Sequence, residues 1–179
     1  NERKILEKLR HDFIANMHYA FNDRDNLYLV MDLLSGGDLR YHIGRIGKFN
    51  EDQTKFLIAC IIVAISTFKD ESFSQRYQTL ESIFDENGYL KLTDFGIARL
   101  DSPSQSLDAS GTPGYMAPEV LCKQVHSYPV DFYALGIICY ELIMGKVTFY
   151  LNFLEPYHGN NRNEIRDAIL SKQHSIKKS

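Results

Sequence analysis

A short strand that ends in a carboxylate is the feature of the sequence with the clearest chemical potential. Residues 89–93, Tyr-Leu-Lys-Leu-Thr, alternate apolar and polar side chains as a half-buried strand does, and Asp94-Phe95-Gly96 follows at once. A carboxylate at the end of a strand is a ligand that hard divalent cations prefer. The pattern therefore predicts that Asp94 binds a metal ion.

A second motif follows after a Ser-rich polar segment, in residues 111–119, Gly-Thr-Pro-Gly-Tyr-Met-Ala-Pro-Glu. Asp94-Phe95-Gly96 resembles the magnesium-binding Asp-Phe-Gly of protein kinases, and Ala117-Pro118-Glu119 resembles the Ala-Pro-Glu that closes their activation segment. Either triplet occurs by chance in many proteins, but both in this order, with Gly-Thr-Pro between them, are a strong signal. The resemblance covers the chain except residues 69–80, residues 147–155 and the tail.

Composition bounds the remaining possibilities. The 179 residues are 44% hydrophobic and 24% charged, which is typical of a globular chain with one core. A net charge of -3 gives no reason to expect nucleic acid or an anionic membrane as a partner, and the longest apolar run, residues 56–65, is shorter than the roughly 20 residues that span a bilayer. Three cysteines do not fit a disulfide framework, so we expect a reducing, cytoplasmic setting. We also expect a monomer.

The first part of the chain predicts a helix and two strands. Residues 2–9 place apolar side chains at helical spacing, and residues 13–21 and 27–31 alternate as strands around the polar turn 22–26. In the resembling family these would be the C-helix and the last two strands of the small lobe.

The resemblance assigns roles to four residues of this part. Glu2 would orient the Lys that contacts ATP, Met31 would be the gatekeeper, and Asp32 and Leu34 would bond adenine through backbone groups of the hinge. For Glu2, a solvated carboxylate in the first turn of a helix is the alternative.

Four further residues are expected around the nucleotide and the substrate. A Gly-Gly turn leads into a helix with Asp38 in its first turn, where the resemblance implies contact with the ribose or with a basic substrate side chain. A stabilising charge at a helix N-terminus is the alternative for Asp38. By the same resemblance, Ile83 would floor the adenine pocket, Thr93 would lie beside it, and Thr112 would belong to the substrate-side platform.

The rest of the chain is predicted to be mostly helical. Residues 51–68 form a helix with a broad apolar stripe, made of Phe56, Leu57, Cys60, Ile61, Val63, Ala64 and Ile65. Residues 83–92 form a hairpin around an Asn-Gly turn, residues 97–110 a loop, and residues 131–142 and 163–171 two helices. Asp131, at the start of its helix, would support the catalytic loop in the resembling family.

The pattern breaks where that catalytic loop should lie. Kinases have His-Arg-Asp-x-Lys-Pro-x-x-Asn there, whose Asp accepts the substrate hydroxyl proton and whose Asn holds magnesium. Residues 71–82 have no carboxylate, Lys or Asn at the expected places. Arg76 falls roughly where the general base should be, and a guanidinium accepts no proton.

One hypothesis explains the broken loop at the level of the gene. If residues 74–79 are encoded TCA CAG AGA TAT CAA ACC, skipping the first nucleotide yields codons for His-Arg-Asp-Ile-Lys-Pro. The loop would then be encoded but translated in the wrong frame, and the alternative is an unrelated, divergent loop. Residues 147–155, an aromatic-rich insert relative to the family, would similarly be a retained short intron. The transcript sequence decides both.

Together these observations predict an α+β, protein kinase-like fold with a small-lobe remnant in residues 1–34 and a partial, mostly helical large lobe in residues 35–179, truncated at both ends. The sequence of residues 34–42 resembles that of the AGC group of serine/threonine kinases, in its YANK-like branch. The implied activity is transfer of the γ-phosphate of ATP, with Mg²⁺, to a protein Ser or Thr, impaired in this chain. The alternative is a pseudokinase-like scaffold that binds protein partners, or a mis-predicted gene product.

Overall fold

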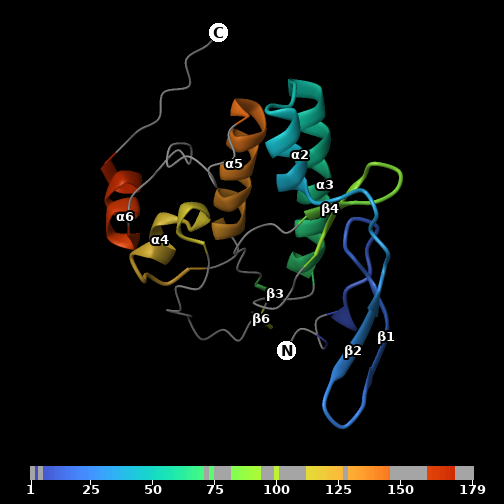
Figure 1. Cartoon of the computed structure of the whole chain (residues 1–179). Coiled ribbons are helices and arrows are strands. Elements are labelled where there is room, and N and C mark those ends of the chain that lie inside the picture. Colours follow the sequence, from blue (N-terminus) through green and yellow to red (C-terminus); the bar gives the residue numbers. More distant parts are fainter. Residues whose placement is uncertain are drawn as a thin grey trace.

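The elements of the fold are arranged around two helices that lie side by side. The computed structural model describes residues 3, 6–70, 73–74, 82–93, 99–100, 112–126, 129–145 and 161–171. Figure 1 shows α3 and α5 at the centre, with β1 and β2 on one side and α4 and α6 on the other. The elements are β1 (Met17–Asn22), β2 (Leu27–Met31), α2 (Leu39–Ile46), α3 (Glu51–Asp70), β3 (Phe73–Ser74), β4 (Ser82–Phe84), β5 (Leu90–Leu92), β6 (Arg99–Leu100), the 3-10 helix η1 (Pro113–Tyr115), α4 (Pro118–Leu121), α5 (Pro129–Met144) and α6 (Arg162–Ser171).

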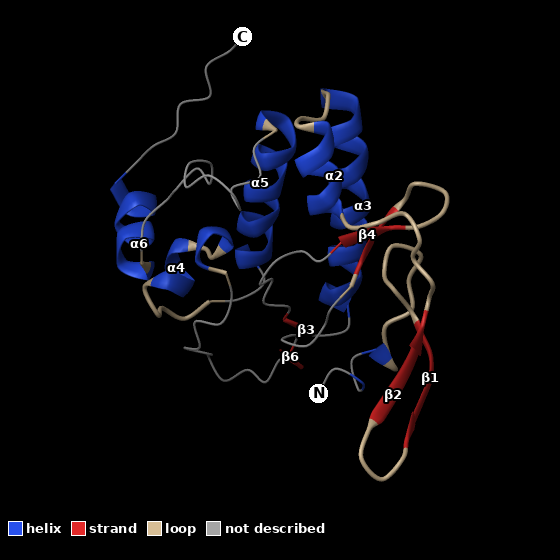
Figure 2. Cartoon of the chain, in the orientation of Figure 1, coloured by secondary structure: helices blue, strands red, loops and turns tan. Residues whose placement is uncertain are grey.

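The strands of the described residues pair two by two. Figure 2 draws them in red, with β1 and β2 as a long pair at one side of the helices, and the antiparallel pairs are β1–β2, β3–β6 and β4–β5. Helix α3 packs against both α5 and β5, which places the core between the helices and the β4–β5 hairpin. The expected mixed α+β fold is therefore confirmed. No helix in the described part of the chain combines the length and apolar character needed to cross a bilayer.

The expected strand over residues 13–21 begins later than predicted. The structure starts β1 at Met17, because residues 13–15 pair with β5 and not with β2. The amide of Leu92 donates to the Phe13 carbonyl at 2.9 Å, and the amide of Ala15 donates to the Leu92 carbonyl at 2.9 Å. Apolar alternation continues through this segment, so the pattern alone did not reveal the change of partner.

The β4–β5 hairpin and the long helices agree with their predicted ranges to within two residues at each end. The hairpin turn is stabilised by Asp85, whose Oδ1 accepts from the amides of Asn87 and Tyr89, both at 2.9 Å. Gly88 adopts φ of 85°, a left-handed conformation that favours glycine. The apolar stripe of α3 is narrower than predicted, since Phe56 and Val63 are exposed.

Two local predictions were wrong. Asp38 is not in the first turn of α2 but is its N-cap, and its Oδ1 accepts from the amide of Tyr41 at 2.7 Å. The expected loop 97–110 contains β6, which pairs with β3 upstream of the β4–β5 hairpin. For the expected helix over residues 2–9, Arg3 and Leu6 are helical, and the amide of Glu7 donates to the Arg3 carbonyl at 2.9 Å.

Candidate functional site

The candidate site is built around the β4–β5 hairpin, which is hydrogen-bonded on both of its sides. On one side, β5 pairs with residues 13–15 as described above. On the other, the Gly36 amide donates to the Phe84 carbonyl at 2.8 Å and the Phe84 amide donates to the Gly37 carbonyl at 2.9 Å. We call residues 13–16, 32–38 and 82–93 together the junction.

Gly36 is required by the close approach of two backbones in the junction. A Cβ at this position would lie 2.5 Å from the Cβ of Phe84 and 2.7 Å from its carbonyl oxygen. Contacts this short force the backbone apart, because neither atom belongs to the flexible end of a side chain. The next residue, Gly37, has φ of 79°, so the Gly-Gly pair serves two separate geometric needs.

The junction brings together several of the residues expected to bind the nucleotide. Asp38 forms an antiparallel bridge with Ile83, and Met31 and Asp32 follow each other at the end of β2. Met31, Asp32, Leu34, Ile83 and Thr93 are half-buried, whereas Asp38 is exposed. Half-burial leaves part of each side chain accessible, as contact with a ligand requires.

The side chain of Asp32 makes polar contacts with three residues of the junction and of β1. Its Oδ2 accepts from the backbone amide of Asn16 at 3.0 Å and from Asn16 Nδ2 at 3.1 Å. Its Oδ1 lies 2.7 Å from His18 Nε2, and Lys91 Nζ is 3.7 Å from Oδ2. Burial opposes ionisation of Asp32, but the hydrogen bonds from Asn16 and His18 and the charge of Lys91 outweigh it and lower the pKa of this carboxyl.

The backbone of residues 32–34, the expected hinge, has groups that remain available for hydrogen bonding. The amide of Asp32 donates to the Asn16 carbonyl at 2.9 Å. Within the described part of the chain, the Asp32 carbonyl and the Leu34 amide make no backbone hydrogen bond. One acceptor and one donor, two residues apart, match in number and type the edge of an adenine ring, so the residues present fit the nucleotide that the resemblance implies.

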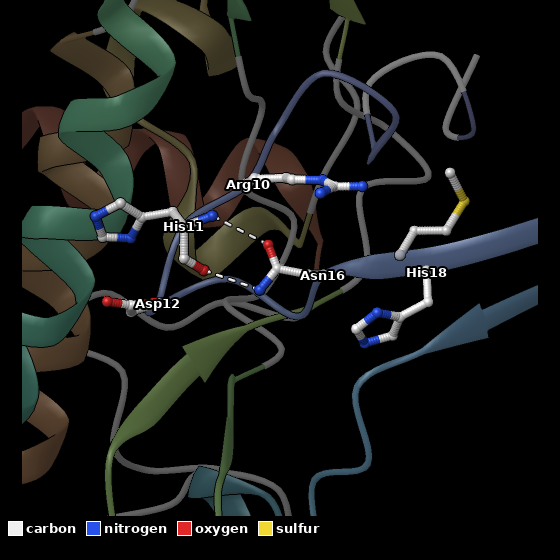
Figure 3. Close-up of a pocket in the computed structure, with 6 residues that line it drawn as sticks. Arg10, His11, Asp12, Asn16 and His18 are labelled. Carbon is white, nitrogen blue, oxygen red and sulfur yellow. Dashed lines mark hydrogen bonds between the residues drawn. The ribbon is translucent and has the colours of Figure 1, made fainter.

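A cavity of about 290 Å³ lies next to the junction (Figure 3). Its lining residues are Arg10, His11, Asp12, Asn16, Met17 and His18. None of the residues expected to bind the nucleotide lines it, so it is a separate feature. It borders the hinge, however, because Asn16 and His18 are the residues that contact Asp32.

Near Thr112, the structure reveals a buried polar contact that sequence reasoning missed. Thr112 is the N-cap of η1, and Tyr115 at the end of η1 donates its hydroxyl to Glu141 Oε1 at 2.6 Å. Both side chains are buried, with 7% and 6% of their surface exposed, and Arg40 lies over the Tyr115 ring with Cζ 5.5 Å from the centroid. A charged residue within the apolar run 134–142 was the available signal, because a buried carboxylate needs a hydrogen-bond partner.

The remaining predicted site residues divide into two groups. Asp131 lies in the first turn of α5 and is buried, with 4% of its surface exposed. Glu2 and Asp94, with residues 71–72, 75–81 and 147–155, lie outside the described residues. Within those residues no group of three or more His, Cys, Asp or Glu side chains is placed to hold a metal ion, and the predicted metal ligand Asp94 is not among them.

Comparison with known proteins identifies the family of the chain. The protein kinase domain family matches residues 1–178. A probable serine/threonine-protein kinase of Dictyostelium discoideum is 36% identical over 175 residues, which are 96% of this chain and 37% of that protein. Protein kinase 2 of the same organism is 37% identical over 173 residues, 96% of this chain and 34% of that protein.

A third relative extends the comparison to an animal. Serine/threonine-protein kinase sgk-1 of Caenorhabditis elegans is 32% identical over 180 residues, 98% of this chain and 37% of that protein. The chain thus spans little more than a third of the length of these three curated relatives and only 22% of the length of others that it matches. Because the family match extends over almost every residue, the chain belongs to the protein kinase domain family, whose serine/threonine members are phosphotransferases.

Proposed function

We propose that this chain is part of a serine/threonine protein kinase domain of the AGC group that binds ATP with Mg²⁺ against its hinge. Residues 1–34 would be a remnant of the small lobe and residues 35–179 a partial large lobe. Asp32 and Leu34 would bond adenine through their backbone, with Met31, Ile83 and Thr93 around the ring and Asp38 near the ribose. Asp94 would hold Mg²⁺, which neutralises the charge of the phosphates when bound, and Glu2 would orient a lysine.

The hinge is the single observation that carries this proposal. In the described residues, the Asp32 carboxylate is held by Asn16, His18 and Lys91, so protein groups already occupy this side chain. The Asp32 carbonyl and the Leu34 amide, in contrast, have no backbone partner there. Leaving a donor and an acceptor unpaired in a half-buried segment costs free energy unless a ligand or water binds them. This arrangement favours a ligand with the donor and acceptor pattern of adenine.

Nucleotide binding tests the proposal directly. We expect MgATP to raise the thermal unfolding temperature of the chain, and Asp94→Asn to reduce that shift strongly, because the metal would lose its carboxylate ligand. Asp52→Asn is the control, since Asp52 is exposed in the first turn of α3. No shift with the unaltered chain at millimolar MgATP would contradict the proposal.

Catalysis is a separate question, because residues 71–82 lack the general base and its neighbours. This observation favours a second function, a pseudokinase-like scaffold that binds proteins without phosphorylating them. Phosphoryl transfer depends on several positioned groups that fail together when one is missing. A radiolabelled-ATP assay with a protein substrate separates the two: turnover abolished by Asp94→Ala supports the enzyme, and nucleotide binding without turnover supports the scaffold. The transcript sequence across residues 66–83 tests whether the loop is encoded in another frame.

A further inference from the structure

The cavity of about 290 Å³ is formed where a loop folds back on the start of β1. Asn16 closes this loop, because its Nδ2 donates to the carbonyls of His11 at 3.1 Å and Ile14 at 3.0 Å, and its Oδ1 accepts from the His11 amide at 3.0 Å. The closed loop brings Arg10, at its beginning, and His18, in β1, to the same cavity (Figure 3).

The polar side chains that line the cavity are not equally available to a ligand. Asn16 Nδ2 also donates to Asp32 Oδ2 at 3.1 Å, so the two hydrogens and the oxygen of this amide are all engaged. Asn16 is therefore a fixed wall of the cavity. Figure 3 shows the side chains of His11 and Asp12 pointing away from the Arg10 guanidinium, on the other side of Asn16.

Arg10 is the charged group that remains available. It is exposed, and it makes no hydrogen bond or ion pair with any residue that the structure describes. A guanidinium keeps its positive charge at every accessible pH, and its planar set of N–H donors matches the two oxygens of a carboxylate. An unpaired guanidinium at the edge of a cavity therefore favours an anionic ligand.

Two neighbours of Arg10 complete the lining on this side. His18 Nε2 lies 2.7 Å from Asp32 Oδ1, and because a carboxylate can only accept, Nε2 carries the hydrogen. The other ring nitrogen, Nδ1, makes no hydrogen bond within the described part of the chain, and it donates when the ring is protonated. Met17 is buried, with 8% of its surface exposed, and supplies an adaptable apolar wall.

The size and charge of the cavity limit the ligand further. Asp12 also lines the cavity, and Asp32 lies behind His18, so a second negative charge on the ligand would be repelled. A volume of about 290 Å³ is at the lower end of the range for ligand pockets, and it suits a short molecule or a single side chain. A monoanionic group on a short apolar stem meets both limits.

We propose that this cavity is a binding site for a carboxylate on a short apolar stem, either a glutamate side chain of a protein partner or a small organic acid. Arg10 would bind both carboxylate oxygens, protonated His18 would donate a further hydrogen bond, and Met17 would pack against the stem. The site goes beyond the proposed function, because none of the residues expected to bind the nucleotide lines it. The two proposals therefore fail separately: a chain that binds no MgATP can still bind a carboxylate.

The Met17 methyl group provides a reporter inside the cavity. Labelling the four methionine methyl groups of the full chain with carbon-13 gives signals that NMR can follow, and Met17→Leu identifies the one that belongs to Met17. We expect a blocked pentapeptide, with glutamate between alanines, to shift this signal saturably with a dissociation constant on the order of 1 mM. The same peptide with glutamine should bind at least about tenfold more weakly, because it carries no charge. Met144, exposed in α5, should not respond.

Arg10→Gln and Arg24→Gln are a matched pair of variants. Both remove one exposed guanidinium, but Arg24 lies in the turn between β1 and β2, away from the cavity lining. Because Arg10 has no partner among the described residues, its loss should leave the fold intact. We expect Arg10→Gln to weaken the glutamate peptide by about tenfold and Arg24→Gln to leave its affinity unchanged. The proposal is overturned by a Met17 signal that does not shift, by an unchanged affinity in Arg10→Gln, or by equal binding of the glutamine peptide.

Two further ligands identify the class and the source of the carboxylate. A pentapeptide with phosphoserine in place of glutamate should bind no more tightly, and tenfold tighter binding would overturn the assignment to a monoanion. Butyrate tests the source with the same methyl signal. Butyrate that binds as tightly as the glutamate peptide supports the site with a free organic acid as its ligand, and binding of the peptide alone supports the site with a protein partner.

Discussion

The junction and the outer face of the β1–β2 hairpin are built on opposite principles. In the junction, backbone groups of three segments bond one another, and a buried leucine, a glycine and a carboxylate are each fixed by neighbours. On the hairpin, the facing pairs Tyr19–Val30 and Phe21–Tyr28 are all exposed, Tyr19 by 71%. The rings of Phe21 and Tyr28 stack on each other with centroids 5.0 Å apart.

This difference shows which region is stabilised by contacts within itself and which depends on packing against the rest of the fold. Two strands alone are marginally stable in water, so the hairpin depends on its inner face, where Ala20 and Leu29 pack against the core. The junction, in contrast, combines apolar burial with hydrogen bonds that run in several directions. Substitutions in the two regions should therefore differ in their effect on the free energy of unfolding.

The largest effect is expected for the leucine at the centre of the junction. Leu92 is 2% exposed, and Leu92→Ala should reduce the free energy of unfolding by about 3 kcal/mol through lost burial and a residual cavity. The exposed hairpin residue Val30 is the counterpart, and Val30→Ala should cost less than about 0.5 kcal/mol. Urea unfolding followed by circular dichroism measures both. Equal losses would mean that the hairpin face is buried in solution.

A smaller but still substantial loss is expected for Gly36→Ala. The added methyl group would meet the backbone and Cβ of Phe84 and should destabilise the fold by about 2 kcal/mol. Gly44→Ala is the control, because nothing lies within 4 Å of a Cβ there and the position is exposed in α2. That substitution should stabilise the chain by about 0.5–1 kcal/mol, since alanine favours a helix. A neutral Gly36→Ala would show that the two backbones separate easily.

Acid titration compares a carboxylate of the junction with one of the hairpin turn. The pKa of Asp32 is lowered, so its contribution to stability is present above the unfolded-state pKa and is lost as the pH falls through the folded-state pKa, below about pH 4. Hydrogen bonds from the Asp25 amide, the Tyr28 hydroxyl and the Asn26 amide lower the pKa of Asp23 in the same direction.

Asp32→Asn should flatten the acid limb of the stability profile more than Asp23→Asn, because only Asp32 is partly buried beside a cation. Thermal unfolding between pH 2.5 and pH 6, a range chosen to bracket the usual pKa of an aspartate, measures both slopes. The reverse order would place the stronger carboxylate contacts in the hairpin.

The smallest change in stability is expected on the hairpin face itself. Tyr19→Thr replaces an exposed aromatic ring with a residue that also favours a strand, and should alter the free energy of unfolding by less than about 0.5 kcal/mol. Light scattering at increasing protein concentration is the second measurement, since exposed apolar faces promote association. A loss as large as that of Leu92→Ala would remove the contrast between the two regions.

Much of the fold could be predicted because helices and tight turns leave patterns in neighbouring residues of the sequence. Apolar periodicity located α3 and α5, and Asn87-Gly88 located the β4–β5 turn, since glycine suits the left-handed conformation there. The pairing of residues 13–15 with Leu92 could not be predicted, because alternation shows that a segment is extended but not which strand it bonds. The β3–β6 pair escaped for the same reason, with only two residues in each strand.

The candidate site was predictable to a different degree. Motifs predicted which residues form the hinge and that Asp94 binds the metal, but they do not record where a side chain points. The turn of the Asp32 carboxylate onto Asn16 and Lys91 depends on contacts between residues 16 and 59 positions apart in the numbering, which no local pattern records. Asn16 itself carried no signal, since a lone asparagine between apolar residues is equally typical of a solvated strand end.

The two hydrogen bonds made by the Leu92 backbone have a consequence for the kinetics of amide hydrogen exchange. Its amide hydrogen is held by the Phe13 carbonyl, and its side chain is buried, with 2% of its surface exposed. Exchange with deuterium at this single amide should therefore require the loop to leave β5, and should be slow while the amide of Arg24, in the exposed turn between β1 and β2, exchanges quickly. The exchange rate of the Leu92 amide would then report how often the first part of the chain separates from β5, and it can be measured without any ligand.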